Sequence, residues 1–215
     1  MLLDSLVARA ARLADGRRAI LGIAGSPGAG KSTLARTLVD QLDPLGDWVA
    51  LVPMDGFHLA NATLSRRGRR DRKGAIDTFD AHGYLAVLRR FRAEVDRTVF
   101  APDYDRLLEE PVAGSIPVHP GVRLIVTEGN YLLSELAPWP EIRAEIDEVW
   151  FVDADDRARR ERLVARHVRF GKSEGEARRW VAEVDEANAR QIELGRSSAD
   201  LVIDSLILEA EAPAR

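Results

Sequence analysis

A glycine-rich stretch near the N-terminus, GIAGSPGAGKSTLARTL, has residue types and spacing that suit phosphate binding; its pattern is Gly25-x-x-x-x-Gly30-Lys31-Ser32. Glycines let a turn point its backbone N–H groups at phosphate oxygens, and a helix that follows directly adds positive potential. A lysine at this position reaches the β- and γ-phosphates, and the serine hydroxyl suits Mg²⁺. A glycine-rich turn without a ligand is the alternative, but the apolar run before it and the helical pattern after it argue against that. The predicted phosphate-binding residues are Gly25, Ser26, Gly28, Ala29, Gly30, Lys31, Ser32 and Thr33.

A magnesium ion would need a second protein ligand, which such sites usually take from an acidic residue that ends a neighbouring apolar strand. Glu128 closes the run RLIVTEGN and is the predicted partner of Ser32. Its alternative role is a loop or helix-capping carboxylate. Asp153 ends VWFVD and competes for the metal, although VDADD also suits an N-cap for the next helix.

The stretch VPMDGFHLANATL contains a candidate catalytic carboxylate, Asp55. Asp55 comes directly after the apolar run, where its carboxylate would face the γ-phosphate across the crevice at the strand ends. A carboxylate there can orient a substrate hydroxyl and accept its proton during phosphoryl transfer. The alternative is an aspartate that merely forms an Asp-Gly turn. The phosphate loop nearby favours the catalytic role.

Five short apolar runs supply the strands that would position these groups. Continuous apolar runs are typical of strands that are covered on both faces. Helical patterns separate most of them, over 30–42, 80–95, 155–170 and 174–194. The runs are AILGIAG near residue 20, WVALVPM near 50, VRLIVTEG near 125, DEVWFVDA near 150 and LVID near 202.

Strands that alternate with helices form a parallel sheet with right-handed crossovers. The predicted fold is therefore α/β, a three-layer P-loop NTPase fold with a central parallel sheet, helices on both faces and a small helical lid. The segment from Thr98 predicts a small hairpin beside the main sheet, and the segment from Ser65 is polar and strongly basic. An N-terminal amphipathic helix is also predicted, because apolar residues recur at helical spacing at Leu3, Leu6, Val7, Ala10 and Leu13.

Composition restricts the class of protein further. The hydrophobic fraction of 46% supports a packed core, and the lack of cysteine excludes disulfides and thiolate metal sites. A net charge of −4 gives no reason to expect nucleic-acid binding. No apolar run suits a membrane span or a signal peptide. We therefore expect a soluble cytoplasmic protein without nucleic-acid or membrane partners. His82, His119 and His167 do not suggest a metal site.

The motifs also carry a family resemblance that covers nearly the whole chain. GSPGAGKST, PMDGFHL and TEGNYLL resemble the uridine kinase, phosphoribulokinase and bacterial pantothenate kinase superfamily, and the match continues through FAPDYDR, EEPV, RLVARH, DEANARQI and ADLVID. The branch most similar to it is the small bacterial kinases described as fructose-transport-system or uridine-kinase-like kinases. The resemblance implies ATP and Mg²⁺ as cofactors, Asp55 as catalytic base, and Lys31 with Ser32 at the phosphates and the metal. The resemblance does not decide whether the protein forms a homodimer.

The resemblance further implies a mobile lid over approximately 157–180 and an acceptor-side insertion over approximately 56–118, within one domain of residues 1–215. Arg166 fits the role of a lid arginine that closes over the γ-phosphate. Whether Arg162 and Arg169 share this role is left undecided. A solvated basic helix face is the alternative for all three. On the acceptor side, Arg72 and Lys73 could hold an anionic or hydroxyl-rich molecule. The predicted substrate-binding residues are His58, Arg72, Lys73, Tyr104, Arg106 and Asn188.

The function predicted from these residues is ATP-dependent phosphoryl transfer to a hydroxyl of a small metabolite, a fructose-like sugar or a related polyol or nucleoside. APDYDR lacks the histidine that pantothenate kinases place shortly before the tyrosine that Tyr104 resembles, which argues against pantothenate. The residues after Asp55 do not favour uridine. The alternative is a nucleotide-dependent regulatory switch or ATPase that acts on a protein partner. No Asn-Lys-x-Asp guanine-binding motif occurs in the sequence, which argues against a GTPase.

Overall fold

The computed structural model describes residues 3–209, and a five-stranded parallel sheet lies at its centre. The strand order is β2-β5-β1-β6-β7, so the first strand lies in the middle and later strands are added on both sides of it. Every neighbouring pair in this sheet is parallel. The five predicted strands are confirmed as β1 (Ala19–Ala24), β2 (Val49–Leu51), β5 (Leu124–Glu128), β6 (Glu148–Asp153) and β7 (Leu201–Asp204).

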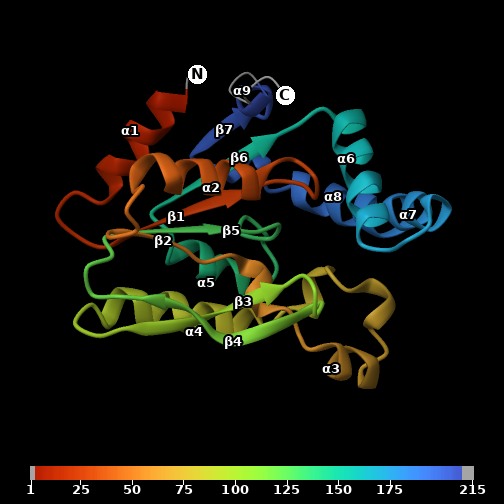
Figure 1. Cartoon of the computed structure of the whole chain (residues 1–215), viewed down its shortest axis with the longest axis horizontal. Helices are drawn as coiled ribbons and strands as arrows, with labels where there is room; N and C mark the ends of the chain where they lie inside the picture. The colour runs from red at the N-terminus through yellow and green to blue at the C-terminus, as the bar shows by residue number, and fades with distance from the viewer. Residues whose placement is uncertain (1–2, 210–215) are drawn as a thin grey trace.

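Helices cover both faces of the sheet, as the continuous apolar strands require. In β1, Ile20 packs into one hydrophobic layer and its neighbour Leu21 packs into the other. Figure 1 shows α1 (Leu3–Leu13) and α2 (Lys31–Leu42) over one face, and α4 (Ala81–Ala93) with α5 (Trp139–Ala144) on the opposite side. The predicted α/β architecture is therefore confirmed, including the amphipathic N-terminal helix.

A helical group lies at the edge where the strands end (Figure 1). It consists of α6 (Asp156–Arg169), α7 (Glu174–Trp180) and α8 (Glu186–Glu193). The helical pattern predicted over 174–194 is confirmed, and a π-helical turn, Val181–Asp185, joins α7 to α8 within it. The sequence did not predict this single turn of π-helix, a rare element within α-helices.

The predicted hairpin is present as β3 (Val99–Asp105) and β4 (Glu110–Val118), which pair antiparallel. Its inner residues join the same hydrophobic layer as α4 and α5. No helix in residues 3–209 has the length and apolar character needed to cross a membrane. Short elements that the sequence did not predict are the 3₁₀ turns η1 (Met54–Phe57), Arg70–Arg72, Ile76–Thr78 and Arg196–Ser198, and the helices α3 (Asn61–Arg66), α5 and α9 (Leu206–Glu209).

Candidate active site

The glycine-rich loop between β1 and α2 has a backbone that requires glycine. Gly25, Gly28 and Gly30 have φ angles of 146°, 79° and 104°, which residues with side chains rarely adopt. A Cβ at Gly25 would lie 2.6 Å from the carbonyl oxygen of Val152, and a Cβ at Gly28 would lie 2.8 Å from that of Arg159. The loop is therefore packed tightly between β6 and α6, a shape that fits the predicted phosphate-binding loop.

Lys31 begins α2 and turns its side chain back into this loop. Its Nζ donates a 3.1 Å hydrogen bond to the backbone oxygen of Ser26, and the side chain is buried. Burial lowers the pKa of Lys31 to about 8, although the charges of Glu128 and Asp55 oppose this shift. Ser26 Oγ donates to Glu193 Oε1 at 2.6 Å and so ties the loop to α8. The lysine thus lies within the loop and within electrostatic reach of two carboxylates.

Two further predicted phosphate-binding residues lie on the loop and on the first turn of α2. Ala29 is buried, and its N–H donates to the backbone oxygen of Ser26 at 3.1 Å. Thr33 is exposed. All eight residues of the predicted set therefore belong to one continuous loop-to-helix segment.

The predicted metal ligands are brought together from two elements. Ser32 Oγ, on the first turn of α2, donates to Glu128 Oε1, at the end of β5, at 2.8 Å. Asp153, the alternative ligand, instead pairs with Arg196 at 2.5 Å. Within residues 3–209, no three His, Asp or Glu side chains form a group that could hold a metal by themselves. The hydroxyl and carboxylate oxygens of the pair fit Mg²⁺, which keeps several waters and takes substrate phosphates as further ligands.

Asp55 lies in η1, a short distance along the chain after β2. Its carboxylate accepts a hydrogen bond from Nη2 of Arg106 at 2.9 Å, and its side chain is 28% exposed. Burial opposes its ionisation, but His58, Arg106 and Lys31 outweigh that effect, so the pKa of Asp55 lies below its ordinary value. The pKa of Glu128 is raised by burial and by the negative charge of Asp55. The environment thus favours an ionised Asp55 beside the metal-binding pair.

His58 is held in one orientation beside Asp55. Its Nδ1 lies 2.8 Å from the backbone oxygen of Asp55, and because that oxygen can only accept, the proton belongs on Nδ1. The ring packs against Phe79 and Tyr104, with centroid distances of 4.0 and 5.0 Å. Burial lowers the pKa of His58, although Asp55 opposes this. A neutral imidazole therefore forms part of the wall next to the predicted base.

Tyr104 and the cations around it form the rest of that wall. The Nζ of Lys73 lies 4.9 Å from the ring centroid of Tyr104, and the guanidinium of Arg106 lies 5.5 Å from it. Lys73 also donates to Asn61 Oδ1 at 2.8 Å and to the backbone oxygen of Glu109 at 2.6 Å. His58, Lys73, Tyr104 and Arg106, predicted from separate segments, are thus assembled beside Asp55.

Two other predicted substrate-binding residues are not part of this assembly. Arg72 is half-exposed and pairs with Asp77, on the same loop. Asn188 lies buried on α8, and among the described residues it forms no side-chain hydrogen bond. The structure gives neither residue a contact with Asp55, so their substrate roles stay predictions.

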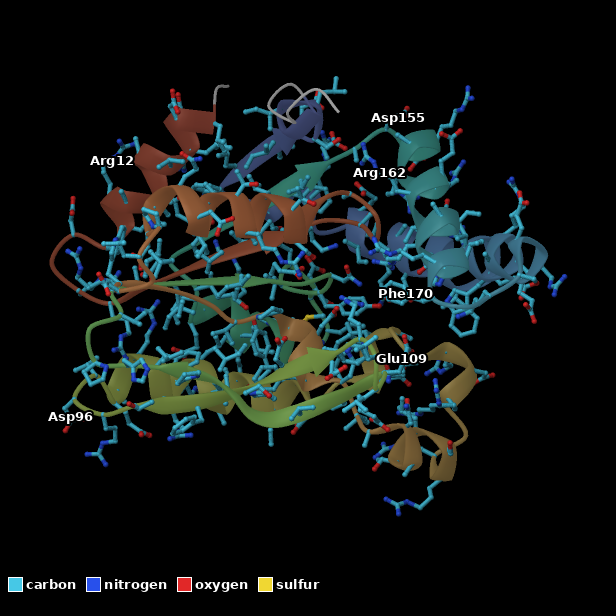
Figure 2. All side chains as sticks on the ribbon, in the orientation of Figure 1. Arg12, Asp96, Glu109, Asp155, Arg162 and Phe170 are labelled. Carbon is cyan, nitrogen blue, oxygen red and sulfur yellow. The ribbon has the colours of Figure 1, made fainter. Side chains whose placement is uncertain are left out.

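The arginines of α6 differ in their relation to the loop. Arg162 Nη1 donates to the backbone oxygen of Gly28 at 3.4 Å, and Figure 2 shows it on the loop side of α6. Arg166 is exposed. Burial is the main cause of the lowered pKa of Lys31, Glu128 and Asp55 oppose it, and the positive charge of Arg166 adds a smaller lowering effect. Arg169 is exposed at the last residue of α6. Arg166 is thus within electrostatic reach of the loop lysine, as its predicted role requires.

Sequence reasoning missed Arg159. This buried residue of α6 donates to the backbone oxygen of Pro27 at 3.3 Å and pairs with Glu186 on α8. It therefore joins the glycine-rich loop to two helices. Its spacing of three residues from Arg162 was the available signal, since residues i and i+3 share a helix face.

A glycine-rich loop between the first strand and a helix, in a parallel sheet of this order, defines a P-loop nucleotide-binding fold. A family model described as the methylmalonyl Co-A mutase-associated GTPase MeaB matches residues 2–61. That segment contains the loop and Asp55 but less than a third of the chain, so this match does not identify the family of the whole protein.

Longer matches come from individual proteins. A provisionally assigned uridine kinase of Schizosaccharomyces pombe is 32% identical over 215 residues, which cover 96% of this chain and 92% of that protein. The crystal structure of a provisionally assigned fructose transport system kinase from Silicibacter sp. TM1040 has 35% identity and a TM-score of 0.86, and it covers 94% of this chain and 99% of its own. A pantothenate kinase of Bacillus velezensis is 38% identical over 116 residues, 53% of this chain and 36% of that enzyme.

The chain belongs to the uridine kinase, pantothenate kinase and phosphoribulokinase superfamily of P-loop kinases. Members of this group are ATP-dependent kinases of small molecules, so the predicted enzyme class and the predicted fold are both confirmed.

Proposed function

We propose that the protein transfers the γ-phosphoryl group of Mg·ATP to a hydroxyl of a small polyhydroxylated metabolite, a sugar or a related polyol. The observation that carries the proposal is the position of Asp55. Its carboxylate lies within electrostatic reach of Lys31 on one side and is bonded to Arg106 of the acceptor wall on the other. A general base for an acceptor hydroxyl needs this position, between the nucleotide and the second substrate.

On the donor side, the loop and Lys31 bind the phosphates and neutralise their charge. Ser32 and Glu128 would hold Mg²⁺, which supplies positive charge to the β- and γ-phosphate oxygens when bound. We further propose that residues 157–180 act as a lid and that Arg166 stabilises the negative charge that spreads over the transferred group. Arg159 keeps this lid attached to the glycine-rich loop.

On the acceptor side, Asp55 orients the hydroxyl and accepts its proton. The hydroxyl oxygen then forms the bond to the γ-phosphorus, and the bond from that phosphorus to the bridging oxygen of ADP breaks. His58 and Tyr104 contribute neutral polar groups and flat surfaces to the acceptor wall, which suits a hydroxyl-rich molecule. Exclusion of water by the lid would prevent simple hydrolysis.

The match of residues 2–61 to a GTPase family favours one second function, a nucleotide-dependent switch that acts on a protein partner. Such a protein would hydrolyse its nucleotide slowly and regardless of small molecules. The absence of an Asn-Lys-x-Asp motif and the assembled acceptor wall favour the kinase.

The test is ADP release from Mg·ATP across a panel of ketoses, aldoses, pentoses, nucleosides, pantothenate and other alcohols, with Asp55→Asn as the paired control. We expect at least one member to accelerate ADP release in the natural protein and not in the variant. Slow ADP release that is indifferent to every member would contradict the kinase proposal and support the switch.

A further inference from the structure

The predicted base is paired with a cation from the acceptor wall. Arg106, which directly follows β3, donates to Asp55 Oδ2 at 2.9 Å, and the two side chains are 46% and 28% exposed. A hydrogen bond from a guanidinium occupies one carboxylate oxygen and reduces its ability to accept a proton. Loss of this partner would therefore make Asp55 a stronger base for the acceptor hydroxyl. Half-exposed ion pairs are weak, so a competing ligand can replace the bond easily.

A second cation, Lys73, lies near the same aromatic ring, that of Tyr104. Lys73 approaches the ring of Tyr104, and its hydrogen bonds go to neutral oxygens, the amide of Asn61 and the backbone of Glu109. No carboxylate forms an ion pair with Lys73 among the described residues. The nearby carboxylate of Glu110 instead accepts hydrogen bonds from the backbone N–H of Asn61 with both of its oxygens.

Charges of both signs surround Lys73. Lys73 experiences the positive charge of Arg70 and the negative charges of Glu110, Glu109 and Asp55. Arg70 is exposed and has no side-chain hydrogen bond or ion pair among residues 3–209. Arg70, Lys73 and Arg106 thus present three positive charges around Tyr104, and among the described residues Asp55 is the one carboxylate that forms an ion pair with any of them.

We propose that the acceptor is an anionic polyol, with a carboxylate or a phosphate monoester that binds Arg106 and Lys73 and thereby frees Asp55 for the acceptor hydroxyl. This inference rests on the proposed kinase function and specifies its substrate class. An acceptor anion replaces the carboxylate of Asp55 as the partner of Arg106, so the guanidinium stays paired while Asp55 is released to the acceptor hydroxyl. A neutral polyol offers no such replacement and leaves Asp55 paired with Arg106, with its basicity reduced.

The experiment compares matched acceptors that differ in charge: gluconate with sorbitol, glycerate with glycerol, and ribose 5-phosphate with ribose. ADP release gives kcat/KM for each, and calorimetry with a non-hydrolysable ATP analogue present gives binding. The variant is Arg106→Gln. Its matched control is Arg97→Gln, an exposed arginine just before the opposite end of β3 that pairs only with its neighbour Asp96 among the described residues.

We expect at least one anionic acceptor to exceed its neutral partner by about 10- to 100-fold in kcat/KM, the range for a charged hydrogen bond. The carboxylate and phosphate pairs show which anion is used. Arg106→Gln should lower kcat/KM for the anionic acceptor much more than for its neutral partner and so remove most of this preference, and Arg97→Gln should keep it.

Equal or better use of the neutral partners by the natural protein would overturn the anionic acceptor and leave the kinase function intact. An equal loss for charged and neutral acceptors in Arg106→Gln would overturn it too, because a merely structural arginine has that effect. Anions that bind through Arg106 without any transfer would contradict the kinase function and retain the anion site.

Discussion

The position of Gly56 allows a direct test of how the hairpin forms the acceptor wall. A Cβ on this residue would lie 2.7 Å from the carbonyl carbon of Pro102 and 3.2 Å from the Cα of Asp103, both in β3. Because carbon atoms pack at about 3.5–4.0 Å, Gly56→Ala must move η1 and β3 apart by about 1 Å. Asp55 lies in η1, and Arg106 directly follows β3. A misplacement of about 1 Å can reduce turnover about 100-fold, which is about 3 kcal/mol of transition-state stabilisation.

The assay for Gly56→Ala is kcat/KM for the preferred acceptor, together with the affinity for an ATP analogue. We expect kcat/KM to fall about 100-fold and the affinity for the ATP analogue to change little, since the glycine-rich loop packs against β6 and α6. Gly121→Ala is the control, because its Cβ would meet only the backbone oxygen of Asp47 at an ordinary 3.5 Å. Normal acceptor kinetics in Gly56→Ala would refute the reasoning, as would an equal loss of nucleotide affinity.

Three further predictions address the lid, the metal and stability. Arg166→Ala should lower kcat by about 100-fold with little effect on ATP affinity; an unchanged kcat would make it a surface residue. Glu128→Gln should raise the Mg²⁺ concentration needed for half-maximal activity by about 10- to 100-fold, and an unchanged titration would remove Glu128 from the site. Asp147→Asn should lower the free energy of unfolding by about 1–3 kcal/mol at pH 7, because Asp147 accepts bonds from the backbone N–H of Ile20 and from Arg92. Burial opposes the ionisation of Asp147, but these bonds outweigh it and lower the pKa of the carboxyl group. The difference in free energy of unfolding between the natural protein and Asp147→Asn, measured with urea, should therefore shrink as the pH falls below about 4. A difference that does not depend on pH would contradict this.

The sheet and the phosphate loop could be predicted because their signals are local. A strand buried on both faces is a continuous apolar run, and Gly25 and Gly30 occupy backbone conformations that few residues other than glycine adopt. The meeting of Ser32 and Glu128 also followed from the sequence, since parallel strands end at the same edge of a sheet. These inferences needed only the order of the strands.

Contacts that depend on the orientation of distant segments could not be predicted. The bond between Arg106 and Asp55 joins residues that are 51 positions apart, and it depends on how the hairpin packs against η1. Arg72 and Lys73 are neighbours in the sequence, yet only Lys73 reaches Tyr104, because the chain turns between them. Arg159 looked like any other arginine of a basic helix, and only the packing of α6 against the loop buries it.

The most direct test of the central claim follows the phosphoryl group itself. The protein is incubated with the acceptor panel and ATP labelled with ¹⁸O in its γ-phosphate, and the products are analysed by mass spectrometry. The account predicts that the labelled phosphate appears as an ester of one acceptor and that Asp55→Asn abolishes this product. Label found in inorganic phosphate alone, whatever the acceptor, would contradict the account and identify a nucleotide hydrolase.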